Sequence, residues 1–261
     1  PYSRYMTAKE LETSRENDKG VLVGIGVTVT KDESGYIFID SVTADTPAAQ
    51  SELASGDIIV AINGTDVLEI GYEQAVEQIK GKEGTTLKLT VRRGGVDQDY
   101  ELVRRTIQVK TAYGEMLEGK IGYIRISGFK ESTVEQFNEA LQNLLNDGAV
   151  ALVFDVRGNH GGLVTSVGEC LDPLLPEGDV AFATYRDGRE EVLIRSDAKE
   201  LNLPMAVLVD GDTASAAELF ASALRDFEKA KLYGVTTYGK GVMQNTISLD
   251  DGGGLTITVA T

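Results

Sequence analysis

Hydrophobic and polar positions follow two different patterns along the chain, and the change comes near residue 106. Before it, short strand-like runs are separated by turn sequences such as Asn63-Gly64 and Gly94-Gly95. The pattern predicts a β-rich domain at 20–105, after a polar, partly helical segment at 1–19. Within that domain we expect strands at 26–31, 36–42, 57–62 and 86–92, further strand to about residue 103, and one helix at 71–80.

After residue 106, expected strands alternate with expected helices. The strands are 120–127, 149–155, 205–209, 231–235 and 255–260, and the helices are 134–145, 162–175 and 214–225. The run AVALVFD at 149–155 is almost wholly apolar, which is typical of a strand covered on both faces. Residues 106–261 are therefore predicted to form an α/β core whose helices pack on a sheet.

Composition and charge narrow the classes of function. The formal net charge is −16, which opposes non-specific nucleic-acid binding because that binding needs clustered Lys and Arg. Cys170 is the only cysteine and His160 the only histidine, so we expect no internal disulfide, no metal site and no cofactor. No apolar run approaches the ~20 residues that span a membrane, and no signal-peptide pattern is present, although a leader could lie outside this segment.

Ser215 lies in the segment DGDTASAAE, between an expected buried strand and an alanine-rich helix. A serine at a helix N-terminus has unpaired backbone N–H groups beside it, and the N–H of Ala216 could stabilise an oxyanion. The alternative is that Ser215 or Thr213 only caps the helix.

Lys240 follows in the segment YGKGVMQ, with a glycine on each side. A lysine can act as the base for a serine nucleophile where burial favours its neutral form. If the segment is extended, Lys240 and Gln244 point to one face, and Gln244 could orient the amine. The alternative is a solvated lysine in a turn.

The loop DVRGNHGG at 155–162 comes directly after the apolar strand. Its glycines present bare amides, so Gly161 or Gly162 could supply a second oxyanion donor, unless the loop is an ordinary strand-to-helix turn. The spacing matches neither of the common phosphate-binding glycine motifs. His160 is the alternative base, in a Ser–His–Asp arrangement with Asp155, but nothing in its loop specifies that it reaches Ser215.

Taken together, FDVRGNHGG, DGDTASAAE and TYGKGVMQ resemble the carboxyl-terminal processing (tail-specific) serine proteases, and so do VGIGV and ADTPAAQSELASGDIIVAINGTDV earlier in the chain. The resemblance covers essentially the whole chain and implies a crotonase/Clp-like ββα protease core at 106–261, with a PDZ domain inserted at 20–105. It also implies that the segment 1–19 belongs to the core. It implies a serine endopeptidase that acts through an acyl-enzyme on polypeptides with apolar, free C-termini.

Carried over by position, the resemblance makes Ser215 the nucleophile, Lys240 its base and Gln244 the residue that orients the lysine. Gly161 and Ala216 would form the oxyanion hole. Four further residues would bind the peptide C-terminus through the PDZ loop and strand: Gly24, Ile25, Gly26 and Val27. His160 stands where the family commonly has proline, and the family normally continues beyond Thr261.

The resemblance also implies an exported protein, periplasmic, extracellular or attached to the cell envelope, that binds polypeptide substrates and no nucleic acid. A regulatory protein and a homo-oligomer fit the same family pattern. Two other functions fit parts of the sequence. One is a PDZ peptide-binding module that does not cleave or needs a partner. The other is a crotonase-type acyl-CoA enzyme, which would leave the PDZ-like insert unexplained.

Overall fold

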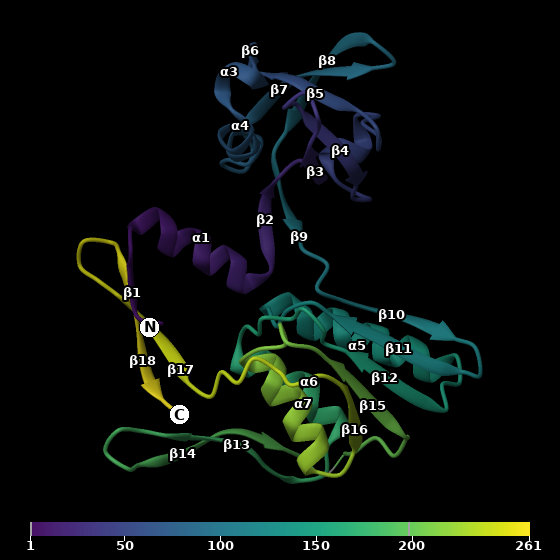
Figure 1. Cartoon of the computed structure of the whole chain (residues 1–261), viewed down its shortest axis with the longest axis vertical. Coiled ribbons are helices and arrows are strands. Elements are labelled where there is room, and N and C mark those ends of the chain that lie inside the picture. Colours follow the sequence, from purple (N-terminus) through teal and green to yellow (C-terminus); the bar gives the residue numbers. More distant parts are fainter. Residues whose placement is uncertain (1, 198) are drawn as a thin grey trace. The chain divides into compact units, whose positions relative to one another are not determined.

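A computed structural model of the chain describes residues 2–197 and 199–261. The chain divides into two compact units, one formed by Val21–Gln108 and the other by Pro1–Gly20 with Val109–Thr261 (Figure 1). Both contain strands and helices, so the expected mixed α/β fold is confirmed.

The smaller unit is built on a sheet with the strand order β3-β4-β5-β7-β8, and β6 pairs with β5. In β7 (Thr86–Arg93) the side chains of Leu87, Leu89 and Val91 are buried while Lys88 is exposed, because successive strand residues face opposite sides. The other elements are β2 (Val21–Gly24), β3 (Val27–Lys31), β4 (Ile37–Val42), β5 (Ile58–Ile62), β6 (Thr65–Asp66), β8 (Val96–Val103), β9 (Arg105–Gln108), α2 (Pro47–Gln50), α3 (Val67–Ile70) and α4 (Tyr72–Ile79).

The larger unit is built on a five-stranded sheet with the order β10-β11-β12-β15-β16. The pair β10–β11 is antiparallel, and the other three neighbouring pairs are parallel. The strands are β10 (Ala112–Leu117), β11 (Ile121–Ile126), β12 (Ala151–Asp155), β15 (Met205–Val209) and β16 (Ala230–Gly234). The helices are α1 (Ala8–Lys19), α5 (Glu131–Asn146), α6 (Val164–Leu171) and α7 (Ala216–Asp226), and a short 3₁₀ turn, η1 (Asp172–Leu174), follows α6.

Four phenylalanines form the centre of the larger unit's core. Phe137 of α5, Phe154 of β12 and Phe220 of α7 are fully buried and contact one another, with ring centroids 5.5–6.4 Å apart. Phe129, in the segment before α5, stacks on Phe220 at 5.6 Å. Through Phe137, α5 therefore packs against β12 and α7 in the core of this unit.

The remaining strands of the larger unit form a sheet in the order β1-β18-β17 and a separate hairpin, β13–β14. Their bounds are β1 (Arg4–Met6), β17 (Met243–Ser248), β18 (Gly254–Ala260), β13 (Gly178–Thr184) and β14 (Glu190–Ser196). The hairpin was not predicted, although the Asp187-Gly188 turn between its strands is a standard hairpin signal. Among the described residues, no helix is long and apolar enough to cross a membrane.

Candidate active site

Three loops that carry the predicted catalytic residues leave the same edge of the five-stranded sheet. They follow the carboxyl ends of β12, β15 and β16, which are neighbouring parallel strands with Asp155 opposite Leu208 and Val209 opposite Gly234. In α/β sheets this edge is the usual place for a functional site. The loops contain Gly161, Ser215 and Lys240, so residues separated by up to 79 positions in the sequence belong to one region of the larger unit.

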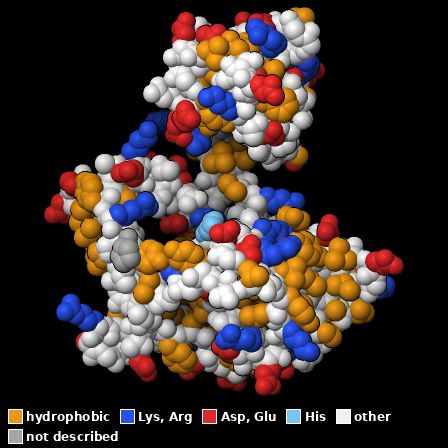
Figure 2. Space-filling view, in the orientation of Figure 1, with side chains coloured by type: hydrophobic (Ala, Val, Ile, Leu, Met, Phe, Trp, Pro, Cys, Tyr) orange, Lys and Arg blue, Asp and Glu red, His pale blue; other side chains and the backbone are white. Residues whose placement is uncertain are grey.

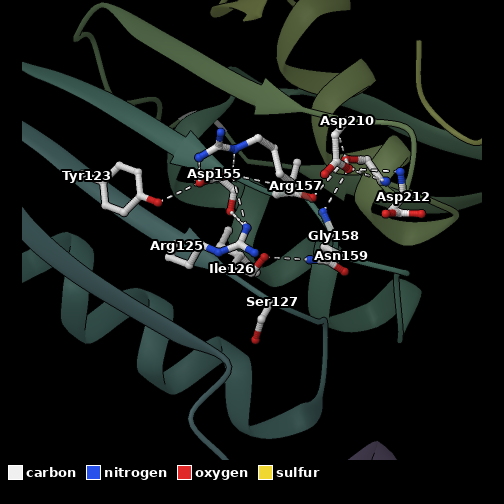
Figure 3. Close-up of polar contacts among 12 residues, drawn as sticks. Tyr123, Arg125, Ile126, Ser127, Asp155, Arg157, Gly158, Asn159, Asp210 and Asp212 are labelled. Carbon is white, nitrogen blue, oxygen red and sulfur yellow. Dashed lines mark hydrogen bonds and ion pairs between the residues drawn. The ribbon is translucent and has the colours of Figure 1, made fainter. Parts of the chain in front are cut away.

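Hydrogen bonds join the first of these loops to the second. The N–H of Ala214 donates to the carbonyl oxygen of Asn159 at 2.9 Å, and the N–H of Gly158 donates to Asp210 Oδ1 at 2.9 Å. The buried side chain of Asn159 also anchors the loop to β11, because its Nδ2 donates to the carbonyl of Ile126 at 3.0 Å (Figure 3). The glycine loop is thus held against the segment that leads to the predicted nucleophile.

Ser215 occupies the N-cap position of α7 in an unusual backbone conformation, with φ 57° and ψ −122°. Positive φ is costly for a residue with a side chain and is often found at functional sites. The side chain is half-buried. The adjacent N–H of Ala216 has no hydrogen-bond partner among the described residues, and it lies at the positive end of a helix dipole. A developing negative charge next to Ser215 would be stabilised there.

Gly161 approaches the nucleophile too closely for any other residue. A Cβ added to it would lie 2.8 Å from the carbonyl oxygen of Ala214, 2.9 Å from the N of Ala216 and 2.9 Å from Ser215 Cβ. The N–H of Gly161, however, donates to Asn159 Oδ1 at 2.8 Å. In this conformation Gly161 is therefore not available as the predicted oxyanion donor, and Ala216 is the available amide.

The main chain of Lys240 makes a hydrogen bond within the site, whereas its side chain makes none there among the described residues. Its N–H donates to Glu218 Oε2 at 2.9 Å, while its Nζ lies 4.7 Å from the centroid of the Tyr2 ring. No hydrogen bond joins Lys240 Nζ to Ser215 Oγ in the part of the chain that the structure describes. The main chains of Ser215 and Lys240 therefore lie close together, while the Lys240 side chain lies over the Tyr2 ring. Glu218 was not singled out from the sequence, although Ser215-x-x-Glu218 is a capping-box pattern.

Gln244 does not contact Lys240 in this structure. Its Nε2 donates weakly to the carbonyl of Val242 and to Thr258 Oγ1, at 3.4 Å each. Lys240 and Gln244 were expected to share one face only if the segment between them is a strand, but β17 begins at Met243 and its pairing is irregular between Met243 and Gln244. A role of Gln244 in orienting the lysine requires a different conformation of residues 240–243.

His160 is exposed (Figure 2, pale blue), and the carboxylate of Asp155 is hydrogen-bonded to residues other than His160. The carboxylate of Asp155 accepts hydrogen bonds from Tyr123 at 2.7 Å, from Arg157 at 2.7 and 2.9 Å and from Arg125 at 3.2 Å (Figure 3). Burial alone would raise the pKa of Asp155, but the hydrogen bonds from Arg157 and Tyr123 lower it to about 2. Burial raises the pKa of Tyr123 to about 12, and the hydrogen bond that Tyr123 donates to Asp155 is the second cause. A Ser–His–Asp arrangement through His160 has no geometric support.

Cys170 is fully buried in α6, and burial raises the pKa of its thiol. It is therefore a packing residue and not a nucleophile. Among residues 2–197 and 199–261, no group of three or more His, Cys, Asp or Glu side chains is placed to hold a metal ion.

The predicted peptide-binding residues lie together in the smaller unit. Gly24 ends β2, Ile25 and Gly26 form the connection, and Val27 begins β3. Gly26 has φ 88°, and a side chain there would overlap Thr46. The N–H groups of Ile25 and Gly26 have no hydrogen-bond partner within the described part of the chain. β3 is an edge strand, so a further strand can pair with it.

Comparison with known proteins decides the family. The description "Peptidase family S41" matches residues 120–261, which is more than half of the chain. The chain belongs to peptidase family S41. The description "PDZ domain" matches residues 12–92, and the resemblance to carboxyl-terminal processing proteases is confirmed.

Two curated relatives carry the name of carboxy-terminal processing protease. The protein CtpA of Bacillus subtilis is 35% identical over 262 residues, which cover 100% of this chain and 56% of that protein. The protein from Bartonella bacilliformis is 35% identical over 270 residues, which cover 100% of this chain and 61% of that protein. The S41 chain described here thus spans somewhat more than half the length of these relatives.

Solved structures show the same fold. The photosystem II D1 C-terminal processing protease superposes with a TM-score of 0.57 at 25% identity, covering 100% of this chain and 72% of that one. An S41 protease from Bacteroides fragilis superposes with a TM-score of 0.62 at 21% identity, covering 100% of this chain and 74% of that one.

Proposed function

We propose that this S41 chain is a serine endopeptidase in which Ser215 is the nucleophile and Lys240 the general base. The observation that carries the proposal is the geometry of Ser215 at the N-terminus of α7. Its positive φ places it in a sharp turn beside the unpaired N–H of Ala216 and next to Gly161. A nucleophile and an oxyanion donor are thereby adjacent before substrate binds, which is the arrangement that acyl transfer needs.

The mechanism follows from these groups. Neutral Lys240 accepts the proton of Ser215 as Oγ attacks the peptide carbonyl, and the N–H of Ala216 stabilises the oxyanion. The intermediate collapses, the protonated lysine gives its proton to the departing amine, and an acyl-enzyme remains. Lys240 then takes a proton from water as the water oxygen attacks the ester, and it gives that proton to Ser215 Oγ as the ester bond breaks, which restores Ser215 and neutral Lys240. Before the first step, the Lys240 side chain has to rotate from the Tyr2 ring toward Ser215.

We further propose that the smaller unit binds the C-terminal tails of substrates, with a preference for apolar tails. The unpaired N–H groups of Ile25 and Gly26 suit a terminal carboxylate, and β3 suits a tail that adds as a strand. That two relatives are named carboxy-terminal processing proteases supports this proposal. Export from the cytoplasm is proposed on the family resemblance alone.

The decisive test is incubation with an unfolded, apolar-tailed polypeptide such as casein, beside Ser215→Ala and Lys240→Ala variants whose folding is checked by circular dichroism. The proposal predicts cleavage by the unmodified chain and about a thousandfold slower cleavage by both variants. Cleavage that survives in Lys240→Ala would show that another group is the base, and His160 would be tested next.

A PDZ peptide-binding module that does not cleave is the second candidate. The observation in its favour is that Lys240 Nζ contacts Tyr2 and not Ser215 in this conformation. Binding of a C-terminal peptide without any cleavage by the unmodified chain would support this candidate against the peptidase.

A further inference from the structure

The carboxylate of Glu218 collects four hydrogen bonds from both sides of the proposed dyad. Oε1 accepts from the hydroxyl of Thr237 at 2.7 Å and from the N–H of Gly239 at 2.6 Å. Oε2 accepts from the N–H of Ser215 at 2.8 Å and from the N–H of Lys240 at 2.9 Å. One side chain therefore binds the main chain of the nucleophile and the main chain of the base.

The chemistry of these contacts requires a carboxylate. An ionised carboxylate has no proton to donate and about four acceptor positions on its two oxygens, and all four partners of Glu218 are donors. Although burial disfavours the charge of Glu218, the hydrogen bonds from Thr237 and from the three amides lower the pKa of this group. A glutamine of the same shape would turn its NH₂ group either toward Thr237 and Gly239 or toward the amides of Ser215 and Lys240, so at least one main-chain N–H would lose its acceptor.

The contacts also fix a distance. Because the N atoms of Ser215 and Lys240 bind the same oxygen, they cannot lie more than about 6 Å apart, although 25 positions separate them in the sequence. Little else restrains the second of these segments: Lys240 lies between Gly239 and Gly241 in a stretch without regular structure. The only other main-chain bond described between the two segments joins the N–H of Tyr238 to the carbonyl of Thr213 at 3.0 Å.

The geometry points to Glu218 as a positioning residue that sets the main chain of Lys240 relative to Ser215, while the lysine side chain stays free to rotate. The bond from the Ser215 N–H also supports the strained, positive-φ conformation of the nucleophile. This inference rests on the proposed function, since it assigns Glu218 to the Ser215–Lys240 pair. Glu218 itself touches no reacting atom in this assignment.

The chain contains a matched control. Glu10 stands at the third position of α1, and its Oε2 accepts from the N–H of Thr7 at 2.7 Å, as Glu218 does from the residue that caps α7. Glu10 contacts neither segment of the dyad. Replacing each glutamate by glutamine therefore removes the negative charge from a comparable helix cap, and only Glu218→Gln disturbs the base.

The test measures kcat and KM for an unfolded polypeptide, together with the melting temperature, for the unmodified chain, Glu218→Gln and Glu10→Gln. We expect kcat to fall about a hundredfold in Glu218→Gln, because misplacing a catalytic group by ~1 Å costs about that much, with KM changed less than about threefold. Glu10→Gln should lower the melting temperature without changing kcat more than about twofold.

Equal kcat values in the two variants would overturn the inference, while an inactive unmodified chain would overturn the proposed function. If Glu218→Gln does not fold, the Thr237→Val variant tests the inference instead. It removes one hydrogen-bond donor from Glu218 Oε1, on the side of the base. A loss of kcat of about three- to tenfold at an unchanged melting temperature would support the inference. An unchanged kcat in that variant would overturn it.

Discussion

Replacing Gly161 by alanine should damage catalysis more than stability, and the structure gives the size of both effects. Gly161 has φ 101°, where a residue with a side chain is strained by about 1–3 kcal/mol. The added Cβ would meet the O of Ala214, the N of Ala216 and Cβ of Ser215 at 2.8–2.9 Å, so these atoms must shift by several tenths of an ångström. The overlap costs about 1–3 kcal/mol more, so the total loss of unfolding free energy is about 2–6 kcal/mol.

The loss of kcat in Gly161→Ala is expected because one of the displaced atoms takes part in catalysis. The N of Ala216 is the proposed oxyanion donor, and loss of one such donor lowers kcat by about a hundred- to a thousandfold. Initial rates on an unfolded polypeptide give kcat and KM, and urea unfolding gives the stability.

Gly188 provides the control for this experiment. Its φ is also positive, at 83°, but no atom lies within 4 Å of a Cβ added there. Gly188→Ala therefore carries the backbone strain without the overlap, and it should lose about 1–3 kcal/mol of stability with an unchanged kcat. If Gly161→Ala kept more than half of the kcat of the unmodified chain, the placement of the oxyanion site beside Ser215 would be refuted.

Three further predictions follow from the charges and the burial of particular groups. Because the pKa of Asp155 is lowered from 3.8 to about 2 in the folded chain, its ionised form stabilises the fold above pH ~4, by about 2 kcal/mol, and this contribution is lost as the pH falls toward 2. The difference in unfolding free energy between the unmodified chain and Asp155→Asn should therefore shrink over that interval, and a constant difference would contradict the role given to Arg157 and its neighbours. Amidating the C-terminus of an apolar peptide should weaken its binding at least about tenfold, as measured by fluorescence anisotropy. Equal affinity of the two peptides would refute the proposal that a terminal carboxylate binds at Gly26. Cys170 should resist iodoacetamide in the native chain and react fully in urea, as followed by mass spectrometry, and rapid native alkylation would contradict its burial.

The strand and helices nearest the proposed nucleophile could be predicted from the sequence, because their apolar residues are spaced as the packing of the folded core requires. The apolar run at 149–155 and the helix expected at 134–145 lie within a few residues of the observed β12 and α5. The start of α7 followed from the change to an alanine-rich helix after Ser215. The hairpin β13–β14 was missed, although its Asp187-Gly188 turn could have revealed it.

The polar contacts of the site could not be predicted, because they join distant segments. The Asn159 side chain occupies the N–H of Gly161, and a glycine-rich loop does not reveal which of its amides remain unpaired. The spacing of Lys240 and Gln244 suggested a shared face only on the assumption of a strand that in fact begins at Met243. Glu218 fits a helix-capping pattern, and its contacts with residues 237–240 become visible only in three dimensions.

The central claim, that Ser215 and Lys240 act as nucleophile and base, is tested most directly by mapping the site of a covalent fluorophosphonate adduct. The chain is labelled, digested and analysed by mass spectrometry, beside Lys240→Ala and His160→Ala variants. We predict an adduct on Ser215 alone, formed at least about a hundredfold more slowly in Lys240→Ala and at an unchanged rate in His160→Ala. An adduct on another residue, or a rate that depends on His160 and not on Lys240, would contradict the account.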